Sequence, residues 1–208
     1  MSEPHSYLFK SILIGNTGAG KSSLLERYIN SVFYERSHNK PTIGVEFGSK
    51  EHLINGCLIK NHVWDTAGQE RYKAVIKSYY RNTTVAFFVF DITDLISFID
   101  IKMWLGELDA HGNNTFIKKV LVGNKTDLVD FREVAKDDAS EFAKLNNMTY
   151  FETSAKTGKF VNEMFSESFK DILDDIKSEK INVADNSYGI RLTIMGPSKK
   201  SQNGCCYS

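Results

Sequence analysis

Residues 15–22 read Gly-Asn-Thr-Gly-Ala-Gly-Lys-Ser (GNTGAGKS), which fits the pattern G-x-x-x-x-G-K-[S/T] of a phosphate-binding loop. The apolar run 7–14 before this octet, YLFKSILI, is typical of a buried strand. After the octet, apolar side chains recur at helical spacing, at positions 24, 25, 28, 29 and 32. A strand, a glycine-rich loop and a helix in this order are the context that the motif requires, so the octet predicts a polyphosphate site.

The loop carries the groups that a bound polyphosphate needs. Backbone N–H groups of the loop and of the helix N-terminus converge on an anion, and glycines allow close approaches that a Cβ would obstruct. Lys21 supplies a mobile cation for the outer phosphates, and the Ser22 hydroxyl is a ligand for Mg²⁺. The alternative without function is a turn at the end of a strand. The residues expected to bind the phosphates and the metal here are Gly15, Thr17, Gly18, Ala19, Gly20, Lys21, Ser22 and Ser23.

Length and composition limit the classes of protein that this chain can form. Its 208 residues suffice for one well-buried domain and are few for two. Lys and Arg together number 26, as do Asp and Glu, so no overall charge favours nucleic acid or an anionic bilayer. No apolar run of about 18 residues is present to span a membrane, and the first residues lack the pattern of a signal peptide. We therefore expect an intracellular protein that binds no nucleic acid.

Apolar runs and helical periods alternate over residues 5–178, which we expect to form a single domain. This alternation predicts an α/β fold with a mainly parallel, six-stranded sheet covered by helices on both faces. From about residue 178 the pattern stops, which predicts a flexible tail over 179–208. The expected strands are 7–14, 45–53, 58–64, 85–90, 120–122 and 149–151, and the expected helices begin at Lys21 and cover 98–108, 135–145 and 161–176.

A second motif, WDTAGQE at residues 64–70, follows the third expected strand. Asp65 therefore emerges at the same sheet edge as the phosphate loop and is placed to hold Mg²⁺. Gly68 can turn its backbone N–H onto a γ-phosphate, and Gln69 can orient an attacking water, because phosphoryl transfer needs positioning and charge neutralisation. The alternative is a strand that ends in an Asp turn. With Thr42 as a second hydroxyl for the metal, the catalytic candidates are Gln69, Lys21, Thr42 and Gly68, and the metal candidates are Ser22, Thr42 and Asp65.

A third motif, NKTD at residues 124–127, predicts which base is bound. A carboxylate at Asp127 can accept from both N1–H and the 2-amino group of guanine, whereas adenine offers neither donor. Sites that hydrogen-bond a required group reject analogues that lack it by about 10⁴ or more. After the last short strand, a backbone N–H of the SAK segment can bind guanine O6, with Phe33 covering the ring unless it belongs to the core. The candidates for base recognition are Asn124, Lys125, Asp127, Ser154, Ala155, Lys156 and Phe33.

With these motifs in order over residues 5–178, the chain resembles the Rab family of Ras-superfamily small GTPases. The segments IGVEF (43–47), TAGQERY (66–72), YYR (79–81) and FVFDIT (88–93) are similar to those that set Rabs apart from their relatives. The resemblance implies that Phe47, Trp64 and Tyr79 face effectors, together with Ile43. The segment 60–63, KNHV, departs from the family by its polarity, which bears on the effector face.

The resemblance also implies a function and a set of partners. The chain is expected to bind GTP and GDP with Mg²⁺, to hydrolyse GTP slowly, and to regulate vesicle-mediated membrane traffic through two switches, 33–47 and 68–80. Implied partners are exchange factors, GTPase-activating proteins, effectors, an escort protein and a dissociation inhibitor. A monomer is expected on the cytoplasmic face of an intracellular membrane, cycling with the cytosol.

Other functions remain possible from the sequence. A P-loop kinase or ATPase is disfavoured by the carboxylate of NKTD, and a GTP-binding scaffold without hydrolysis is disfavoured because Gln69, Thr42 and Ser22 are all present. A nuclear-transport GTPase shares the DTAGQE motif, but the cysteine pair at the end of the chain favours a lipid anchor.

The C-terminal residues Cys205 and Cys206 predict this lipid anchor. With Cys57 as the third cysteine, the set forms neither a disulfide framework nor a zinc site. The last four residues also fit C-a-a-X with a terminal Ser, which would place one farnesyl group on Cys205 alone. The Rab resemblance favours geranylgeranyl groups on both cysteines, and one lipid chain by itself binds a membrane only marginally.

Overall fold

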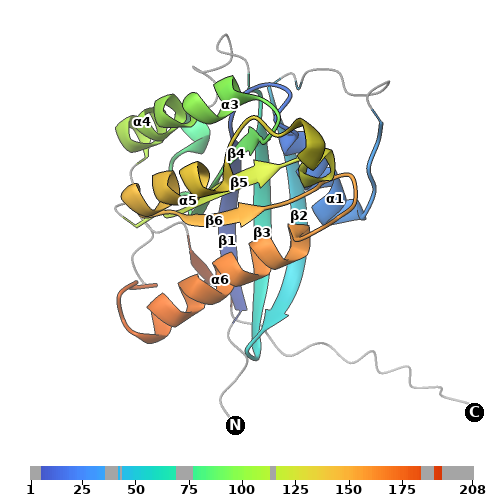
Figure 1. Cartoon of the computed structure of the whole chain (residues 1–208). Helices are drawn as coiled ribbons and strands as arrows, with labels where there is room; N and C mark the ends of the chain where they lie inside the picture. Colours follow the sequence, from blue (N-terminus) through green and yellow to red (C-terminus); the bar gives the residue numbers. More distant parts are fainter. Residues whose placement is uncertain are drawn as a thin grey trace, which may run out of the picture.

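The structure, a computed structural model, describes residues 6–35, 42, 44–68, 77–112, 116–183 and 190–193. Strands and helices alternate along the chain as the sequence predicts (Figure 1). The strands are β1 (Ser6–Ile14), β2 (Val45–Ile54), β3 (Cys57–Thr66), β4 (Val85–Asp91), β5 (Lys118–Asn124), β6 (Thr149–Glu152) and β7 (Arg191–Thr193). The helices are α1 (Lys21–Asn30), α3 (Leu95–Ile99), α4 (Ile101–His111), α5 (Lys136–Leu145) and α6 (Val161–Lys177), with the 3-10 helices η3 (Lys77–Tyr79) and η4 (Thr126–Phe131).

The strands form one sheet in the order β2-β3-β1-β4-β5-β6. β1, β3, β4, β5 and β6 pair in parallel, and β2 pairs antiparallel with β3. This is the mainly parallel, six-stranded sheet that the sequence predicts, with β7 as an additional strand. The phosphate loop and the motifs at residues 65, 91, 124 and 154 all lie at the carboxyl ends of parallel strands or directly after them, where ligands bind in such sheets.

Two hydrophobic layers hold helices against the two faces of the sheet. In β4, Phe87 and Val89 contact the layer that includes α1 and α6, whereas Ala86, Phe88 and Phe90 contact the layer that includes α4 and α5. This period of two is the geometry of a strand buried on both sides. Because β4 is apolar at successive positions, it can bind helices on both faces and place its last residue, Asp91, at the ligand edge.

The helix expected over 98–108 is divided in two. Asp94 caps α3 by accepting hydrogen bonds from the backbone N–H groups of Ile96 and Ser97, and α3 ends at Ile99. α4 then begins at Ile101, and it carries the buried residues of the expected helix, whereas Phe98 lies in α3. Apolar residues recur at helical spacing on both sides of the break, so the sequence pattern alone did not reveal where the first helix ends.

The polar segment before Trp64 has a structural explanation. Asn61 is fully buried, and its amide is satisfied: Ser11 Oγ donates to Asn61 Oδ1 at 2.7 Å, and Asn61 Nδ2 donates to Tyr28 OH at 3.3 Å. Tyr28 OH in turn lies 2.5 Å from His52 Nε2. A buried amide without partners would be costly, so these bonds explain how the central sheet accommodates an asparagine.

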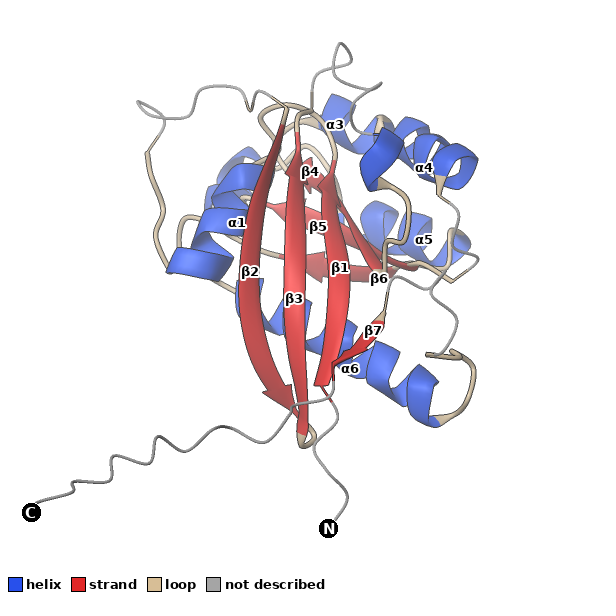
Figure 2. Cartoon of the chain, turned by 180° about the vertical axis from the view of Figure 1, so that it is seen from behind, coloured by secondary structure: helices blue, strands red, loops and turns tan. Residues whose placement is uncertain are grey.

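Part of the expected tail belongs to the folded domain. Ile181 and Ile190 are buried in the layer that contains α1 and α6, and β7 pairs antiparallel with β1, with Arg191 opposite Leu8. Figure 2 shows β7 beside the lower end of β1, next to α6. β4 begins to pair with β1 only at Ser11, so β7 occupies the edge of β1 that β4 leaves open. Among the described residues, no helix is long and apolar enough to cross a membrane.

Candidate functional site

A cleft of about 770 Å³ lies at the carboxyl ends of the parallel strands. All of its lining residues except Glu35 and Leu128 are among the site residues that the sequence predicts. Leu128 directly follows the NKTD motif and Glu35 lies within the expected switch 33–47, so both positions had a signal in the sequence. The lining residues are Thr17, Gly18, Gly20, Lys21, Ser22, Ser23, Phe33, Glu35, Thr42, Gly68, Asn124, Lys125, Asp127, Leu128, Ala155 and Lys156.

The phosphate loop wraps around the ammonium of Lys21. Lys21 Nζ donates to the backbone carbonyls of Gly15 at 2.7 Å and Asn16 at 2.9 Å. Burial lowers the pKa of Lys21 to about 8, and the carboxylate of Asp65 opposes this shift. The lysine is thus held at the base of the cleft, where it can neutralise the charge of an anion.

Gly20 is required by the close approach of the loop to the NKTD segment. Its backbone is left-handed, with φ of 93°, and a Cβ at this position would lie 2.3 Å from Asn124 Nδ2. Asn124 Nδ2 donates to the carbonyl of the neighbouring Ala19 at 2.9 Å. The glycine therefore allows the phosphate-binding loop and the base-recognition motif to be joined by a direct hydrogen bond.

Three oxygen-bearing side chains predicted as metal ligands lie together. Ser22 Oγ donates to Asp65 Oδ2 and lies 2.8 Å from Thr42 Oγ1. Within the described part of the chain, the other carboxylate oxygen, Asp65 Oδ1, is buried and has no hydrogen-bond partner. Burial raises the pKa of Asp65 to about 6, against the opposing effects of Lys21 and Ser22. Hydroxyl and carboxylate oxygens are the ligand types that Mg²⁺ prefers, so this set with its unpartnered oxygen fits that ion.

Gly68 lies directly against the phosphate loop. A Cβ on Gly68 would come within 2.3 Å of Thr17 N and 2.7 Å of Gly15 O, so only glycine fits this position as the backbone stands. The backbone of the DTAGQE motif thus reaches the loop that is expected to hold the outer phosphates. This is the contact that a backbone N–H needs in order to reach a γ-phosphate.

Asn124 connects three parts of the base-recognition end of the cleft. Besides its bond to Ala19, its Oδ1 accepts from the backbone N–H of Ala155 at 3.2 Å and from Thr153 Oγ1 at 3.4 Å. Asn124 therefore ties the loops that follow β1, β5 and β6 into one unit.

The carboxylate of Asp127 is oriented by Ser154. Ser154 Oγ donates to Asp127 Oδ1 at 2.6 Å and accepts from the backbone N–H of Thr157 at 3.1 Å. One carboxylate oxygen of Asp127 is thus fixed by a buried serine, while Asp127 itself lines the cleft. Gly15, Ala19, Asp65 and Ser154 do not line the cleft, and each is hydrogen-bonded to a residue that does.

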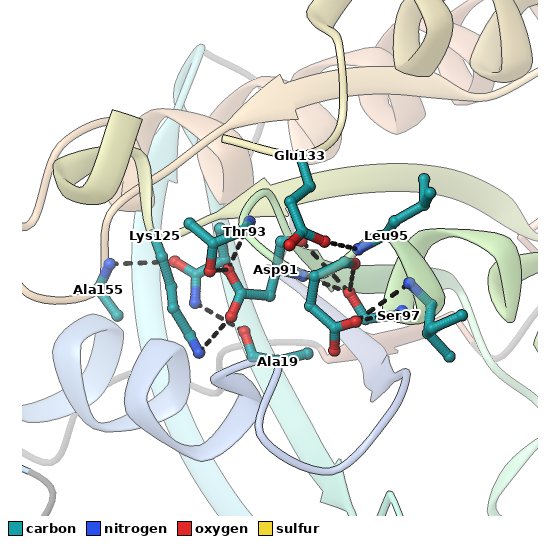
Figure 3. Close-up of polar contacts among 11 residues, drawn as sticks. Ala19, Asp91, Thr93, Leu95, Ser97, Lys125, Glu133 and Ala155 are labelled. Carbon is teal, nitrogen blue, oxygen red and sulfur yellow. Dashed lines mark hydrogen bonds and ion pairs between the residues drawn. The ribbon is translucent and has the colours of Figure 1, made fainter. Parts of the chain in front are cut away.

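Asp91, which the sequence did not single out for the site, binds Lys125. The ammonium of Lys125 lies 2.5 Å from Asp91 Oδ2, and Thr93 donates to Oδ1 through both its backbone N–H and its hydroxyl (Figure 3). Asp91 is the aspartate of the FVFDIT segment, so that motif was the available signal. The acid lies at the end of β4, where it can hold the lysine of the neighbouring β5 loop.

The aromatic residues expected to face effectors form a continuous surface cluster. The ring centroids are 4.8 Å apart for Phe47 and Trp64 and 5.0 Å apart for Trp64 and Tyr79. His62, from the polar segment that departs from the family, packs its ring edge-on against Phe47 at 5.1 Å and so extends the cluster. Phe47 is half exposed, which leaves part of the cluster accessible to a partner.

Several predicted functional residues lie outside the described residues. These are Gln69, Ile43, Cys205 and Cys206.

The fold and the cleft define a class of protein: an α/β protein with a phosphate-binding loop, in which a second loop, the NKTD motif, lines the same cleft. Comparisons identify the family. The model of the Ras family matches residues 10–174. The chain is similar to the GTP-binding protein ypt3 of Schizosaccharomyces pombe, with 38% identity over 213 residues that cover 98% of each chain. It is also similar to the GTP-binding protein YPT1 of Saccharomyces cerevisiae, with 41% identity over 182 residues that cover 88% of this chain and 87% of the relative.

The chain therefore belongs to the Ras family and is a Rab small GTPase, which confirms the family predicted from its motifs. It is a GTP-binding and GTP-hydrolysing switch of vesicle traffic.

Proposed function

We propose that this chain changes its effector-facing surface according to whether GTP or GDP occupies the cleft. Thr42 and Gly68 lie in the two expected switches, and both line the cleft. Thr42 is bonded to Ser22 of α1, and Gly68 contacts the phosphate loop. A γ-phosphate gives both residues an additional ligand, so GTP favours the arrangement in which both switches are held close to the loop.

Hydrolysis is assigned to a small set of groups. Lys21 neutralises charge on the outer phosphates, and the backbone N–H of Gly68 binds the γ-phosphate. Gln69 orients the attacking water, because phosphoryl transfer requires an in-line nucleophile more than a strong base. After cleavage, the bonds of Thr42 and Gly68 to the γ-phosphate are lost, so the switches are released.

Ser22, Thr42 and Asp65 would hold Mg²⁺. When bound, the ion would neutralise charge on the phosphates. The unpartnered Asp65 Oδ1 supports this assignment, because a buried carboxylate oxygen without a partner is costly. Ser22 Oγ is hydrogen-bonded to the other carboxylate oxygen, Asp65 Oδ2, and to Thr42 Oγ1, so it contacts both of the other proposed ligands.

Regulators and effectors are expected for this family, and we assign the cluster of Phe47, Trp64, Tyr79 and His62 to effector binding. Its rings are in contact with one another and partly exposed. Clusters of this kind are favoured at interfaces, because aromatic side chains bury a large area at low entropic cost. Exchange factors and GTPase-activating proteins are then expected at the two switches, and the escort protein and dissociation inhibitor act on the lipid-bearing tail.

Attachment to an intracellular membrane is assigned to geranylgeranyl groups on Cys205 and Cys206. Two chains make membrane binding stable, whereas one makes it marginal. The intact mass of the protein recovered from cells should therefore show two C20 groups. A single C15 group would support farnesylation of Cys205 alone and contradict this assignment.

The observation that carries the guanine specificity is the carboxylate of Asp127, which Ser154 orients in the same cleft as Lys21. Asp127→Asn should shift preference from GTP toward XTP, because the 2-oxo group of xanthine accepts a hydrogen bond where guanine donates one. Competition binding with GTP, XTP and ATP measures this change. Asp130→Asn is a matched control, because Asp130 is an exposed acid in the same 3-10 helix outside the cleft lining. Unchanged selectivity for GTP in Asp127→Asn would remove Asp127 from base recognition.

A further inference from the structure

Arg27, near the end of α1, binds three backbone carbonyls. Its Nε donates to Ala155 O at 2.8 Å, and one terminal nitrogen donates to Lys156 O at 2.6 Å. The other terminal nitrogen donates to Ser31 O at 2.7 Å, at the end of the same helix. Arg27 itself is not among the residues that line the cleft. A single side chain thus joins α1 to the loop after β6 that carries Ser154, Ala155 and Lys156.

The first of these bonds fixes the peptide group between Ala155 and Lys156, two residues that line the cleft. The carbonyl of Ala155 and the N–H of Lys156 belong to one planar peptide unit, and the described residues contain no cis peptide bond. In a trans peptide the carbonyl and the N–H point in opposite directions. Because Arg27 holds the carbonyl, the N–H of Lys156 is directed away from Arg27, on a residue that lines the cleft.

The second bond fixes the next peptide unit, which leads to Asp127. The carbonyl of Lys156 shares its plane with the N–H of Thr157, and that N–H donates to Ser154 Oγ at 3.1 Å. Ser154 Oγ donates in turn to Asp127 Oδ1 at 2.6 Å. A continuous series of bonds therefore runs from the guanidinium of Arg27 to the carboxylate that reads the base.

We propose that Arg27 is a positioning residue for guanine recognition, which acts by orienting both the Lys156 N–H toward guanine O6 and the Asp127 carboxylate. This inference rests on the proposed assignment of base recognition to these two loops. Arginine suits the task because its planar guanidinium presents several N–H donors in a rigid fork, whereas lysine is a point charge on a flexible stem. Three carbonyls at different angles require that fork.

The test compares GDP with 6-thio-GDP, which keeps N1–H and the 2-amino group but presents sulfur, a weak acceptor, in place of O6. We expect wild-type protein to bind GDP roughly tenfold more tightly than 6-thio-GDP, which corresponds to the free energy of one good hydrogen bond. In Arg27→Ala, the affinity for GDP should fall by about tenfold, and the preference over 6-thio-GDP should shrink to about twofold. Competition binding measures both affinities. Alanine has the highest helix propensity, so the substitution leaves α1 intact.

Two further variants make the result specific. Arg27→Lys should lose most of the preference as well, because a lysine cannot bind three carbonyls. Glu26→Ala, at the neighbouring position of α1 that is bonded to Asn30, should keep wild-type affinities. The ratio of GTP to GDP affinity should be unchanged in all three variants, because Arg27 does not contact the phosphate loop.

Two outcomes would overturn the inference: an equal loss of GDP and 6-thio-GDP in Arg27→Ala, or full retention of the preference in Arg27→Lys. An equal loss would mean that Arg27 does not orient the Lys156 N–H toward O6, because an effect on Asp127 alone weakens the binding of both nucleotides alike. Failure of the proposed function would appear differently, as a wild-type protein that does not distinguish GDP from ADP.

Discussion

Lys125 Nζ and Asp91 Oδ2 lie 2.5 Å apart, which joins the end of β4 to the NKTD loop after β5. The side chain of Asp91 is 9% exposed and that of Lys125 is 23% exposed, so solvent screens this ion pair only in part. Thr93 adds two hydrogen bonds to the other oxygen of the carboxylate. The lysine is therefore held at its charged end, while its stem lines the cleft where a purine ring is expected.

Asp91→Asn should release GDP faster. The amide keeps the shape of the side chain but loses the charge that holds Lys125, so the lysine stem is no longer fixed in the cleft. We expect the dissociation rate constant to rise by about tenfold, the cost of one charge-assisted hydrogen bond. Dissociation of a fluorescent GDP analogue measures it. Asp109→Asn is the control, because Asp109 pairs with Lys119 at 2.7 Å on the exposed surface. If both variants released GDP at the wild-type rate, Lys125 would not depend on Asp91.

Gly68→Ala should weaken GTP binding more than GDP binding. The added Cβ would lie 2.3 Å from Thr17 N, so the second switch must move away from the phosphate loop and from the γ-phosphate. Calorimetric titration with a non-hydrolysable GTP analogue and with GDP tests this difference. Gly106→Ala serves as the control, because no atom lies within 4 Å of its added Cβ in α4. That change should stabilise the protein by about 0.5–1 kcal/mol and leave both affinities unchanged. If Gly68→Ala kept the wild-type ratio of GTP-analogue affinity to GDP affinity, the proposed role of this glycine would be contradicted.

Motifs that are local in sequence predicted most of the cleft. The phosphate loop, DTAGQE and NKTD each carry their residue types at fixed spacing, and each follows an apolar run, so the sheet edge on which they meet could be predicted. The FVFDIT motif contains Asp91 but does not reveal its partner Lys125, and no motif points to Arg27. Asp91 meets Lys125 because β4 and β5 are neighbours, and Arg27 meets Ala155 across 128 positions of the chain. Such contacts depend on tertiary packing, which leaves no periodic signal in one sequence.

The extent of the domain was harder to predict for a related reason. β7 has three residues, and although the run 190–194 (IRLTI) alternates apolar and polar residues, it is short and follows a stretch of Asn, Ser and Gly that is typical of a loop. It forms because β4 leaves the edge of β1 open near Leu8, which is a property of strand register. The break between α3 and α4 was likewise hidden, because the apolar period continues across Asp100.

His52 should make the stability of the protein depend on pH. Burial lowers its pKa below the ordinary value near 6.5, and the nearby charge of Lys50 lowers this pKa further. His52 Nε2 also lies 2.5 Å from Tyr28 OH, and its ring stacks on Tyr28. As the pH falls, His52 is therefore protonated in the unfolded chain at a higher pH than in the folded protein. The contribution of neutral His52 to the free energy of unfolding is complete above about pH 6.5 and is lost as the pH falls below it.

Urea unfolding of the GDP-bound protein between pH 7.5 and pH 5.5 measures this dependence. We expect the free energy of unfolding of wild-type protein to fall more steeply with decreasing pH than that of His52→Gln, because glutamine does not titrate. His62, whose pKa burial also lowers, is present in both proteins and cancels in the comparison. Parallel pH profiles for the two proteins would show that His52 is protonated equally well in the folded and unfolded states.

Ile190→Ala should destabilise the domain, although Ile190 lies beyond the region expected to fold. The side chain is 1% exposed and belongs to the core layer that includes α1 and α6. Replacing a buried isoleucine with alanine costs roughly 2–5 kcal/mol, and we expect the lower end because the neighbouring strand β7 is short. Urea unfolding gives this cost. Leu53→Ala is the control, because Leu53 is 76% exposed and its removal should change stability by less than about 0.5 kcal/mol. If Ile190→Ala were as mild as the control, the segment that carries β7 would not be held against β1 in solution.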